Sequence, residues 1–248
     1  MKYAKIKEAA AVIRNTRKTI ALTGAGASTE SGIPDFRSKG GLWSRYDPME
    51  YGTIGAFRAD PDKVWTMLAE LTDITRAEPN AGHLALAAME AGGFLQGIIT
   101  QNIDGLHQKA GSRAVVEFHG SLETFSCLAC GNILTLKEVR QMPLPPACTN
   151  CGSILKPDIV FFDEQIPNEA LLGTNELLTG ADCLIVAGTS CQVVPASRIV
   201  PEVAHQGGTI IEINLEPNLG HLADLVLAGS FAEIMDRLAT ELVDEQGK

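Results

Sequence analysis

Short apolar runs alternate with helix-like patterns along most of the chain. The apolar runs are rich in β-branched residues and cover residues 19–26, 97–100, 114–118, 158–162, 183–188, 209–214 and 224–227. Between most of them, apolar residues recur with helical spacing, as at residues 5–14, 81–91, 168–178, 196–206 and 231–242. A strand buried on both faces gives a continuous apolar run. The alternation therefore predicts a doubly wound parallel sheet, a Rossmann-like α/β fold.

Two segments do not fit this alternation. Residues 38–78 contain several aromatic side chains, no convincing strand and a helical run at 61–71. Residues 123–156 contain four clustered cysteines and the breaker run MPLPP. We interpret both as insertions that form a smaller domain. The predicted division gives residues 1–37, 79–122 and 157–248 to the nucleotide-binding domain, and 38–78 and 123–156 to the small domain.

Composition and charge narrow the class of protein. A chain of 248 residues with 45% hydrophobic residues suits one large globular domain carrying a small one. A formal net charge of -10 argues against nucleic acid as a direct partner, because phosphate binding needs a basic surface. No run approaches the roughly 18 apolar residues of a membrane span, and the N-terminus lacks the apolar stretch of a signal peptide. We therefore expect a cytoplasmic protein.

The first apolar run leads into a glycine-rich turn. Gly24 and Gly26 match the start of a dinucleotide fingerprint, in which glycines let the backbone approach a pyrophosphate. Thr29 replaces the third glycine, and a plain strand-to-helix turn explains these residues equally well. Downstream, the chain breaks the expected helix and presents Asp35, Phe36 and Arg37, side chains that suit a phosphate and a ring, or simply a rigid turn with a salt bridge.

Polar residues follow four further apolar runs. Ligands of this architecture bind at the carboxyl ends of the strands, so we select these residues as candidates, although Asn and Asp also cap helices. His119 stands at a strand end beside a glycine and is a natural general base. The remaining candidates are Gln101, Asn102, Ile103 and Asp104 after the second run, Gly188, Thr189 and Ser190, and Asn214, Leu215 and Glu216.

Four of the six cysteines form two C-x-x-C pairs. This spacing is typical of a zinc ribbon, in which four thiolates close a tetrahedral site. With no open position for water, the zinc would be structural. A redox dithiol is the alternative interpretation. The predicted ligands are Cys127, Cys130, Cys148 and Cys151.

Together these motifs resemble the sirtuins. The segments GAGASTESGIPDFR, TQNIDGLHQKAG, FHG, DIVFFDE, GTS and INLEP occur in sirtuin order and spacing, from about residue 18 to residue 238. The resemblance implies a Rossmann-like large domain and a zinc-plus-helical small domain. It also implies an NAD-dependent protein lysine deacylase, in which NAD is a consumed co-substrate.

The resemblance also assigns roles to single residues. It implies that Ala25, Thr29, Phe36 and Arg37 contact NAD in a mobile loop, and that Gln101 and Asn102 address the ribose. Ile103 and Asp104 would hold the nicotinamide carboxamide, and Gly188 and Ser190 would meet phosphates and ribose. Asn214, Leu215 and the backbone of Phe231 would contact adenosine, and residues 160–162 (Val160, Phe161 and Phe162) would bind the acyl-lysine peptide.

The resemblance implies that His119 is the general base of the reaction and that Asn102 and Asp104 are further catalytic residues. The acyl oxygen attacks the ribose as nicotinamide leaves, and His119 deprotonates a ribose hydroxyl. The products are free lysine, nicotinamide and O-acyl-ADP-ribose. Partners would be acyl-lysine proteins or peptides. Mono-ADP-ribosyl transfer to protein, known for some sirtuins, is the alternative activity.

Departures from the family pattern bear on the substrate. Sirtuins that prefer succinyl or malonyl lysine carry a Tyr-x-x-Arg pair, and the corresponding residues here are Trp65 and Leu68. Without the guanidinium, we expect acidic acyl groups to be poor substrates and acetyl groups to be preferred. Asp163 stands where many members have glycine, and Ala27 replaces a usual isoleucine or valine.

Overall fold

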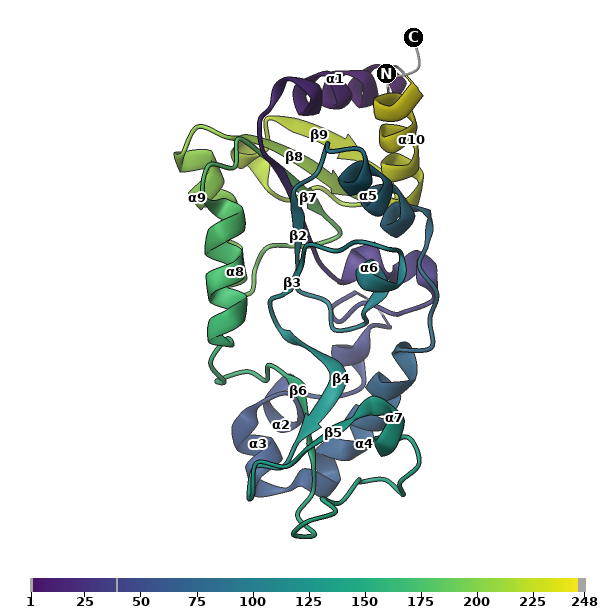
Figure 1. Cartoon of the computed structure of the whole chain (residues 1–248), viewed down its shortest axis with the longest axis vertical. Helices are drawn as coiled ribbons and strands as arrows, with labels where there is room; N and C mark the ends of the chain where they lie inside the picture. The colour runs from purple at the N-terminus through teal and green to yellow at the C-terminus, as the bar shows by residue number, and fades with distance from the viewer. Residues whose placement is uncertain (1, 39, 245–248) are drawn as a thin grey trace.

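The structure is a computed structural model that describes residues 2–38 and 40–244. Its larger lobe is built on a six-stranded parallel sheet in the order β3-β2-β1-β7-β8-β9 (Figure 1). The strands are β1 (Thr19–Thr23), β2 (Gly97–Thr100), β3 (Val115–Glu117), β7 (Cys183–Ala187), β8 (Thr209–Asn214) and β9 (Leu225–Ala228).

Helices cover both faces of this sheet. Strand side chains alternate between the faces, so Ala21 of β1 joins one core cluster while Ile20 and Leu22 join the other. The first cluster packs against α1 (Lys2–Asn15), α5 (Ala81–Ala91) and α10 (Phe231–Asp244). The second packs against α8 (Asn168–Leu178), η4 (Ala196–Arg198) and α9 (Ile199–His205). Burial on both faces explains the continuous apolar runs, and the predicted doubly wound fold is confirmed.

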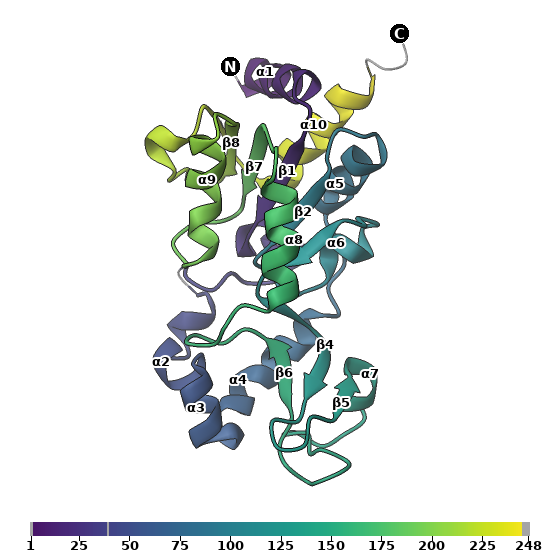
Figure 2. The same ribbon diagram turned by 60° about the vertical axis from the view of Figure 1, so that its left-hand side comes forward.

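A smaller lobe lies at the end of the molecule opposite α1 and α10 (Figures 1 and 2). It contains an antiparallel sheet in the order β5-β4-β6 and its own apolar core, where Trp65 stacks on Phe125 with ring centroids 6.1 Å apart. Its strands are β4 (Gly120–Ser126), β5 (Ile133–Thr135) and β6 (Lys156–Ile159), and its helices are η3 (Leu42–Ser44), α2 (Pro48–Tyr51), α3 (Ile54–Ala59), α4 (Pro61–Ile74) and α7 (Leu136–Val139).

Short helical turns occupy the loops beyond the strand ends. They are η1 (Ala25–Ala27), η2 (Thr29–Ser31), α6 (Leu106–Lys109) and η5 (Gly220–Leu222). None of the described helices is long and apolar enough to cross a membrane.

One predicted strand belongs to a different sheet from the one expected. The apolar pattern predicts that residues 158–162 form a strand of the parallel sheet, but β6 covers Lys156–Ile159 and pairs antiparallel with β4. Two side chains of this run, Ile159 and Phe161, lie in the core of the smaller lobe and not in the core of the parallel sheet. The proposed domain boundaries at 122/123 and 156/157 fall inside β4 and β6, and the division into domains stays a prediction.

Candidate active site

The carboxyl ends of β1 and β7 lie side by side at the centre of the parallel sheet. Thr23, the last residue of β1, is in register with Ala187, the last residue of β7. Strands β2 and β3 continue the sheet on one side of this pair, and β8 and β9 continue it on the other. In open parallel sheets ligands bind where the strand order reverses in this way. The candidate residues that follow β1 and β7 therefore meet at the expected binding edge.

Three glycines bring the loops after β1 and β7 into direct backbone contact. The Gly24 and Gly26 N–H groups donate hydrogen bonds to the carbonyls of Ala187 (3.1 Å) and Gly188 (2.8 Å). A Cβ on Gly26 would lie 2.8 Å from the Gly188 Cα, and one on Gly188 would lie 2.2 Å from the Ala27 nitrogen. These contacts exclude any side chain at positions 26 and 188, whether or not a pyrophosphate approaches the loop.

A buried hydrogen-bond network lies beneath this loop. The Ser28 hydroxyl donates to the Asp104 carboxylate (2.7 Å), and the Asn102 amide donates to the Ser28 hydroxyl (3.1 Å) and to the Gly24 carbonyl (3.0 Å). The other Asp104 oxygen accepts from the Leu106 N–H (2.9 Å). Ser28, Asn102 and Asp104 are all almost completely buried. The network fixes the two predicted residues against the glycine loop, and Ser28 is the link between them.

A second network connects the candidates after β2, β7 and β8. Gln101 donates to the Thr189 hydroxyl (2.9 Å), and Asn214 donates to the Thr189 carbonyl (3.1 Å). The Asn214 amide also donates to Glu212 (3.0 Å), whose fully buried carboxylate accepts from the Asn218 N–H (2.7 Å). Because the Asn214 nitrogen is committed to these acceptors, its oxygen is oriented away from them. The network thus preorganises polar groups along the carboxyl edge of the sheet.

His119 is held in one tautomer by a backbone contact. Its Nδ1 lies 3.1 Å from the Gln101 carbonyl oxygen, which can only accept, so Nδ1 carries the proton and Nε2 has the free lone pair. Desolvation lowers the pKa of His119 below its ordinary value, although the Gln101 hydrogen bond opposes this shift. The ring is therefore neutral at pH 7. A half-buried neutral imidazole with a free Nε2 has the protonation state that a general base requires.

Two further histidines form a buried pair behind the site. The rings of His83 and His107 lie 4.8 Å apart, and burial lowers the pKa of His83 to about 4 and that of His107 to about 3. His83 Nδ1 accepts from the Asn80 N–H (3.3 Å), and His107 Nε2 contacts the Thr23 hydroxyl (2.9 Å). One nitrogen of each ring is hydrogen-bonded, whereas His83 Nε2 and His107 Nδ1 are buried without a hydrogen-bond partner among the described residues.

Comparison with known proteins identifies the family. Residues 24–195 match the sequence profile described as the Sir2 family.

The chain belongs to the Sir2 family.

Relatives and solved structures agree with this assignment. The chain is 44% identical over 235 residues to the NAD-dependent protein deacylase 2 of Pyrobaculum aerophilum, with 93% of each protein covered. It superposes with a TM-score of 0.88 on a Sir2 homolog–NAD complex, at 40% identity over 96% of this chain and 94% of that one. It also superposes with a TM-score of 0.90 on a Sir2 complex with a deacetylated peptide and 3′-O-acetyl ADP-ribose. The identity is 34%, over 95% of this chain and 98% of that one.

The loop after β1 in this Sir2 protein extends toward the smaller lobe. The Asp35 carboxylate accepts from the Arg37 and Ser38 N–H groups and closes a tight turn, so Asp35 stabilises the loop itself. The Phe36 ring lies 5.6 Å from the Trp43 ring. Arg37 is exposed and donates to Gln192 in the loop after β7 (2.6 Å). The salt bridge considered for this turn is not present among the residues that the structure describes; Arg37 instead pairs with the Gln192 amide.

The predicted peptide segment of this Sir2 protein connects the two lobes. The Val160 N–H donates to the His119 carbonyl (2.8 Å), so the segment is bonded directly to the candidate base. Phe161 is buried against Phe57, with ring centroids 5.7 Å apart. Phe162 is 38% exposed, and its ring lies 6.1 Å from the Trp43 ring. The segment therefore carries an accessible aromatic ring two residues after the Val160–His119 hydrogen bond.

The four paired cysteines converge in the smaller lobe. Their sulfur atoms lie within 4.8 Å of one another, with Cys127 Sγ 3.4 Å from Cys151 Sγ and Cys130 Sγ 3.6 Å from Cys148 Sγ. These separations exceed a disulfide bond and are close to the roughly 3.8 Å edge of a zinc–thiolate tetrahedron with 2.3 Å bonds. The residues present fit a structural zinc ion. Because the nearest sulfur atoms come from different C-x-x-C pairs, the geometry favours one shared site over an independent redox pair.

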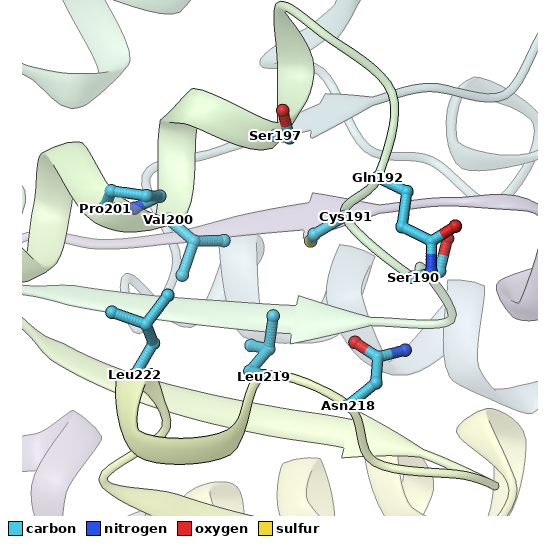
Figure 3. Close-up of a pocket in the computed structure, with 9 residues that line it drawn as sticks. All are labelled: Ser190, Cys191, Gln192, Ser197, Val200, Pro201, Asn218, Leu219 and Leu222. Atoms are coloured by element: carbon cyan, nitrogen blue, oxygen red, sulfur yellow. The ribbon is translucent and has the colours of Figure 1, made fainter.

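A small pocket borders the adenosine half of the predicted site. It has a volume of about 290 Å³ and lies between α9 and the segment after β8 (Figure 3). Ser190, Gln192 and Asn218 gather at the end nearest the carboxyl ends of β7 and β8, and Val200 and Leu222 lie toward the other end. Of the predicted cofactor residues, Ser190 alone lines this pocket. The pocket is thus adjacent to the cofactor path that we expect and is not the path itself.

The remaining predicted residues differ in exposure. Leu215 is 71% exposed at the end of β8, whereas the Phe231 ring is 3% exposed and packs against His83 at 5.5 Å. Any contact of Phe231 with a ligand would therefore come from its backbone, as the resemblance implies. Sequence reasoning missed Ser28 and Gln192 as site residues. For Ser28, the available signal was a hydroxyl directly after the Gly-x-Gly turn.

Proposed function

We propose that this Sir2 protein is an NAD-dependent protein lysine deacylase, and that deacetylation is its main activity. The observation that carries the proposal is the neutral His119, whose Nδ1 is bonded to the Gln101 carbonyl and whose own carbonyl accepts from Val160 of the 160–162 segment. The deacylase and deacetylase names of relatives at 39–44% identity support it. The complexes of related structures with NAD and with an acetyl ADP-ribose support it further.

NAD is expected to lie along the carboxyl edge of the parallel sheet. Asp104 and Ile103 would address the carboxamide of nicotinamide, with Ser28 holding the Asp104 carboxylate. Gln101 and Asn102 would contact the ribose next to nicotinamide. Arg37 would exchange Gln192 for phosphate oxygens, since a guanidinium binds phosphate more strongly than a neutral amide. The remaining proposed contacts are Gly24, Ala25, Gly26, Thr29, Asp35, Phe36, Gly188, Thr189, Ser190, Asn214, Leu215, Glu216 and Phe231.

The proposed chemistry consumes NAD and water. The acyl oxygen of the modified lysine attacks the anomeric carbon of the ribose, and the bond to nicotinamide breaks. Nε2 of His119 then takes the proton of a ribose hydroxyl, whose oxygen attacks the imidate carbon. Water completes the release of free lysine and O-acyl-ADP-ribose. A histidine that is neutral at working pH accepts this proton readily.

The acyl group is expected to be uncharged. Trp65 and Leu68 are both buried, and the Trp65 N–H already donates to the Leu155 carbonyl (2.9 Å). Neither side chain offers a free donor to a succinyl or malonyl carboxylate, and burying an unpaired carboxylate is strongly unfavourable. We expect acetyl or longer apolar acyl groups on lysine side chains of proteins, within the cytoplasm. Zinc would stabilise the smaller lobe through its four cysteines and take no part in the reaction.

A product analysis tests this function. The protein is incubated with NAD and peptides bearing acetyl, butyryl, myristoyl or succinyl lysine, and the products are identified by mass. We expect nicotinamide, free lysine peptide and O-acyl-ADP-ribose from the apolar acyl peptides, and little turnover of the succinyl peptide. Equal rates on succinyl and acetyl peptides would contradict the argument from Trp65 and Leu68.

The same assay separates the alternative activity. With NAD labelled in the adenine ring, a deacylase releases all label as small molecules, whereas a mono-ADP-ribosyltransferase leaves label on protein. The variant His119→Ala should abolish acyl-dependent release of nicotinamide. Protein-bound label without acyl transfer would overturn the deacylase proposal.

A further inference from the structure

An ion pair between the buried Lys156 and the partly buried Glu164 is hydrogen-bonded to the backbone on both sides of Val160. Lys156, the first residue of β6, is only 5% exposed, and its ammonium lies 3.1 Å from the Glu164 carboxylate. The same ammonium donates to the carbonyls of Pro157 (3.1 Å) and Ile159 (2.9 Å). Its three N–H donors are therefore fully used, two of them by the backbone that leads into the segment.

Glu164 forms two hydrogen bonds with the backbone of Phe161. The carboxylate oxygen that pairs with Lys156 also accepts the Phe161 N–H (3.0 Å), and the Glu164 N–H donates to the Phe161 carbonyl (3.1 Å). Between them, Asp163 has φ 64°, a left-handed conformation that turns the chain back so that Glu164 points inward. The Phe161 ring lies over the Lys156 ammonium at 5.0 Å. The pair thus fixes both the backbone and the ring of Phe161.

These contacts determine the direction of one carbonyl group. The peptide units on both sides of Val160 are fixed, the first by Lys156 and His119, the second by the bond from the Phe161 N–H to Glu164. In a planar trans peptide the C=O points opposite to the N–H, so the Glu164 bond orients the Val160 carbonyl. No other described residue donates a hydrogen bond to that carbonyl. It is an oriented acceptor in the segment that borders His119.

We propose that Lys156 and Glu164, through their hydrogen bonds to the backbone, position the 160–162 segment for the acyl-lysine peptide and raise its affinity. The two residues touch neither NAD nor the reacting atoms in this scheme. They act through the Val160 carbonyl and the Phe161 ring. This inference rests on the proposed function, because it takes residues 160–162 as the peptide site. Two of the three Lys156 donors and one Glu164 oxygen are committed to the backbone next to Val160, so loss of either side chain would release that backbone.

Steady-state kinetics of folded variants test the proposal. In Lys156→Met and Glu164→Ala, we expect the KM for an acetyl-lysine peptide to rise about tenfold or more, while the KM for NAD changes less than about twofold. Glu164→Gln should rescue much of the peptide affinity, because its amide oxygen still accepts the Phe161 N–H. Lys63→Met removes an exposed pair with Glu50 in the same lobe and should leave both KM values unchanged.

Each outcome decides the question. Thermal unfolding and zinc content show which variants are folded. If Lys156→Met does not fold, Glu164→Ala alone tests the proposal, because Glu164 is the more exposed partner and its loss disturbs the core less. A peptide KM that rises in Glu164→Ala but stays close to the wild-type value in Glu164→Gln supports the positioning role. Folded variants with unchanged peptide KM, or with peptide and NAD KM raised together, would overturn it. A wild-type protein without any deacylation would instead reject the proposed function.

Discussion

One backbone hydrogen bond decides the chemistry of His119. Had Nδ1 faced a hydroxyl, either nitrogen could have carried the proton, but the Gln101 carbonyl accepts only and assigns it to Nδ1. Gln101 itself is bonded to Thr189 across the sheet edge. The orientation of the base therefore depends on the loop after β2, which also carries Asn102 and Asp104. These two contacts link His119 to the residues that we propose to bind the ribose.

The first prediction concerns the acid limb of activity. Desolvation lowers the pKa of His119 below its ordinary 6.5, so the ring stays neutral until the pH falls below that lowered pKa. Because the base form is required, kcat/KM should stay constant from pH 8 down to about 6.5 and decrease only at lower pH. A pH profile of kcat/KM for the peptide measures this. An acid limb with its midpoint above 6.5 would contradict the assignment of the limb to His119.

How far these residues could be predicted from sequence depends on their position. Asn102, Asp104 and His119 follow apolar runs directly, and the rule that ligands bind at strand ends selects them without a structure. Ser28 could not be selected in this way. Its role depends on Asp104, a residue 76 positions away in the chain, and only the folded sheet brings the two within hydrogen-bond distance.

At the scale of the elements, strands β4 and β6 approach each other closely at Gly120, the residue after His119. Gly120 has φ 71°, and a Cβ there would lie 2.1 Å from the Asp158 carbonyl oxygen. The ladder between the two strands is irregular from Gly120 to Phe125, and the Thr124 hydroxyl bonds to Asp158 (2.6 Å) within this stretch. The crossing brings the end of β3 beside the start of the peptide segment. Glycine is thus required by backbone approach next to the candidate base.

The second prediction replaces this glycine. Gly120→Ala should lower the free energy of unfolding by more than about 2 kcal/mol, since left-handed backbone strain adds to the clash with Asp158. It should also abolish deacylation, because β4 and β6 must separate next to His119 and Val160, which directly precede β4 and follow β6. Chemical denaturation and peptide turnover measure the two effects.

A matched control separates strain from clash. Gly180 has φ 73°, and no atom lies within 4 Å of the position that a Cβ would take there, so Gly180→Ala introduces the strain alone. It should lose about 1–2 kcal/mol and keep its activity. Equal effects at both positions would show that the close approach at Gly120 is unimportant.

Element prediction succeeded where one physical cause produced the pattern. The ranges 81–91 and 168–178 coincide with α5 and α8, because helical periodicity there reflects one face packed on the sheet. The strand predicted at 158–162 was assigned to the wrong sheet, because two different environments produce the same pattern. Burial in the smaller lobe gives the same apolar pattern as burial in a parallel sheet, and pairing partners cannot be read from a single run.

At the scale of the whole molecule, the peptide segment connects two independently built cores. The larger lobe is stabilised by its parallel sheet and two layers of helices, whereas the three-stranded sheet of the smaller lobe is short. Its cysteine cluster lies where the loops before and after β5 and before β6 meet. Metal binding by four thiolates adds stability that a small core of this size lacks. With zinc bound to the four cysteines, the position of residues 160–162, directly after β6, would depend on the metal.

The third prediction removes that metal. Chelation, or Cys148→Ser, should release one zinc per chain and unfold the smaller lobe, because the four thiolates would no longer hold the loops around β5 and β6. Peptide turnover should be lost and should return when zinc is added back to the chelated wild type. Cys183→Ala is the control, since Cys183 is buried in β7 outside the cluster and should leave zinc content at one per chain. Zinc content, turnover and circular dichroism are measured together. Full activity after complete loss of zinc would show that the smaller lobe positions the peptide segment without the metal.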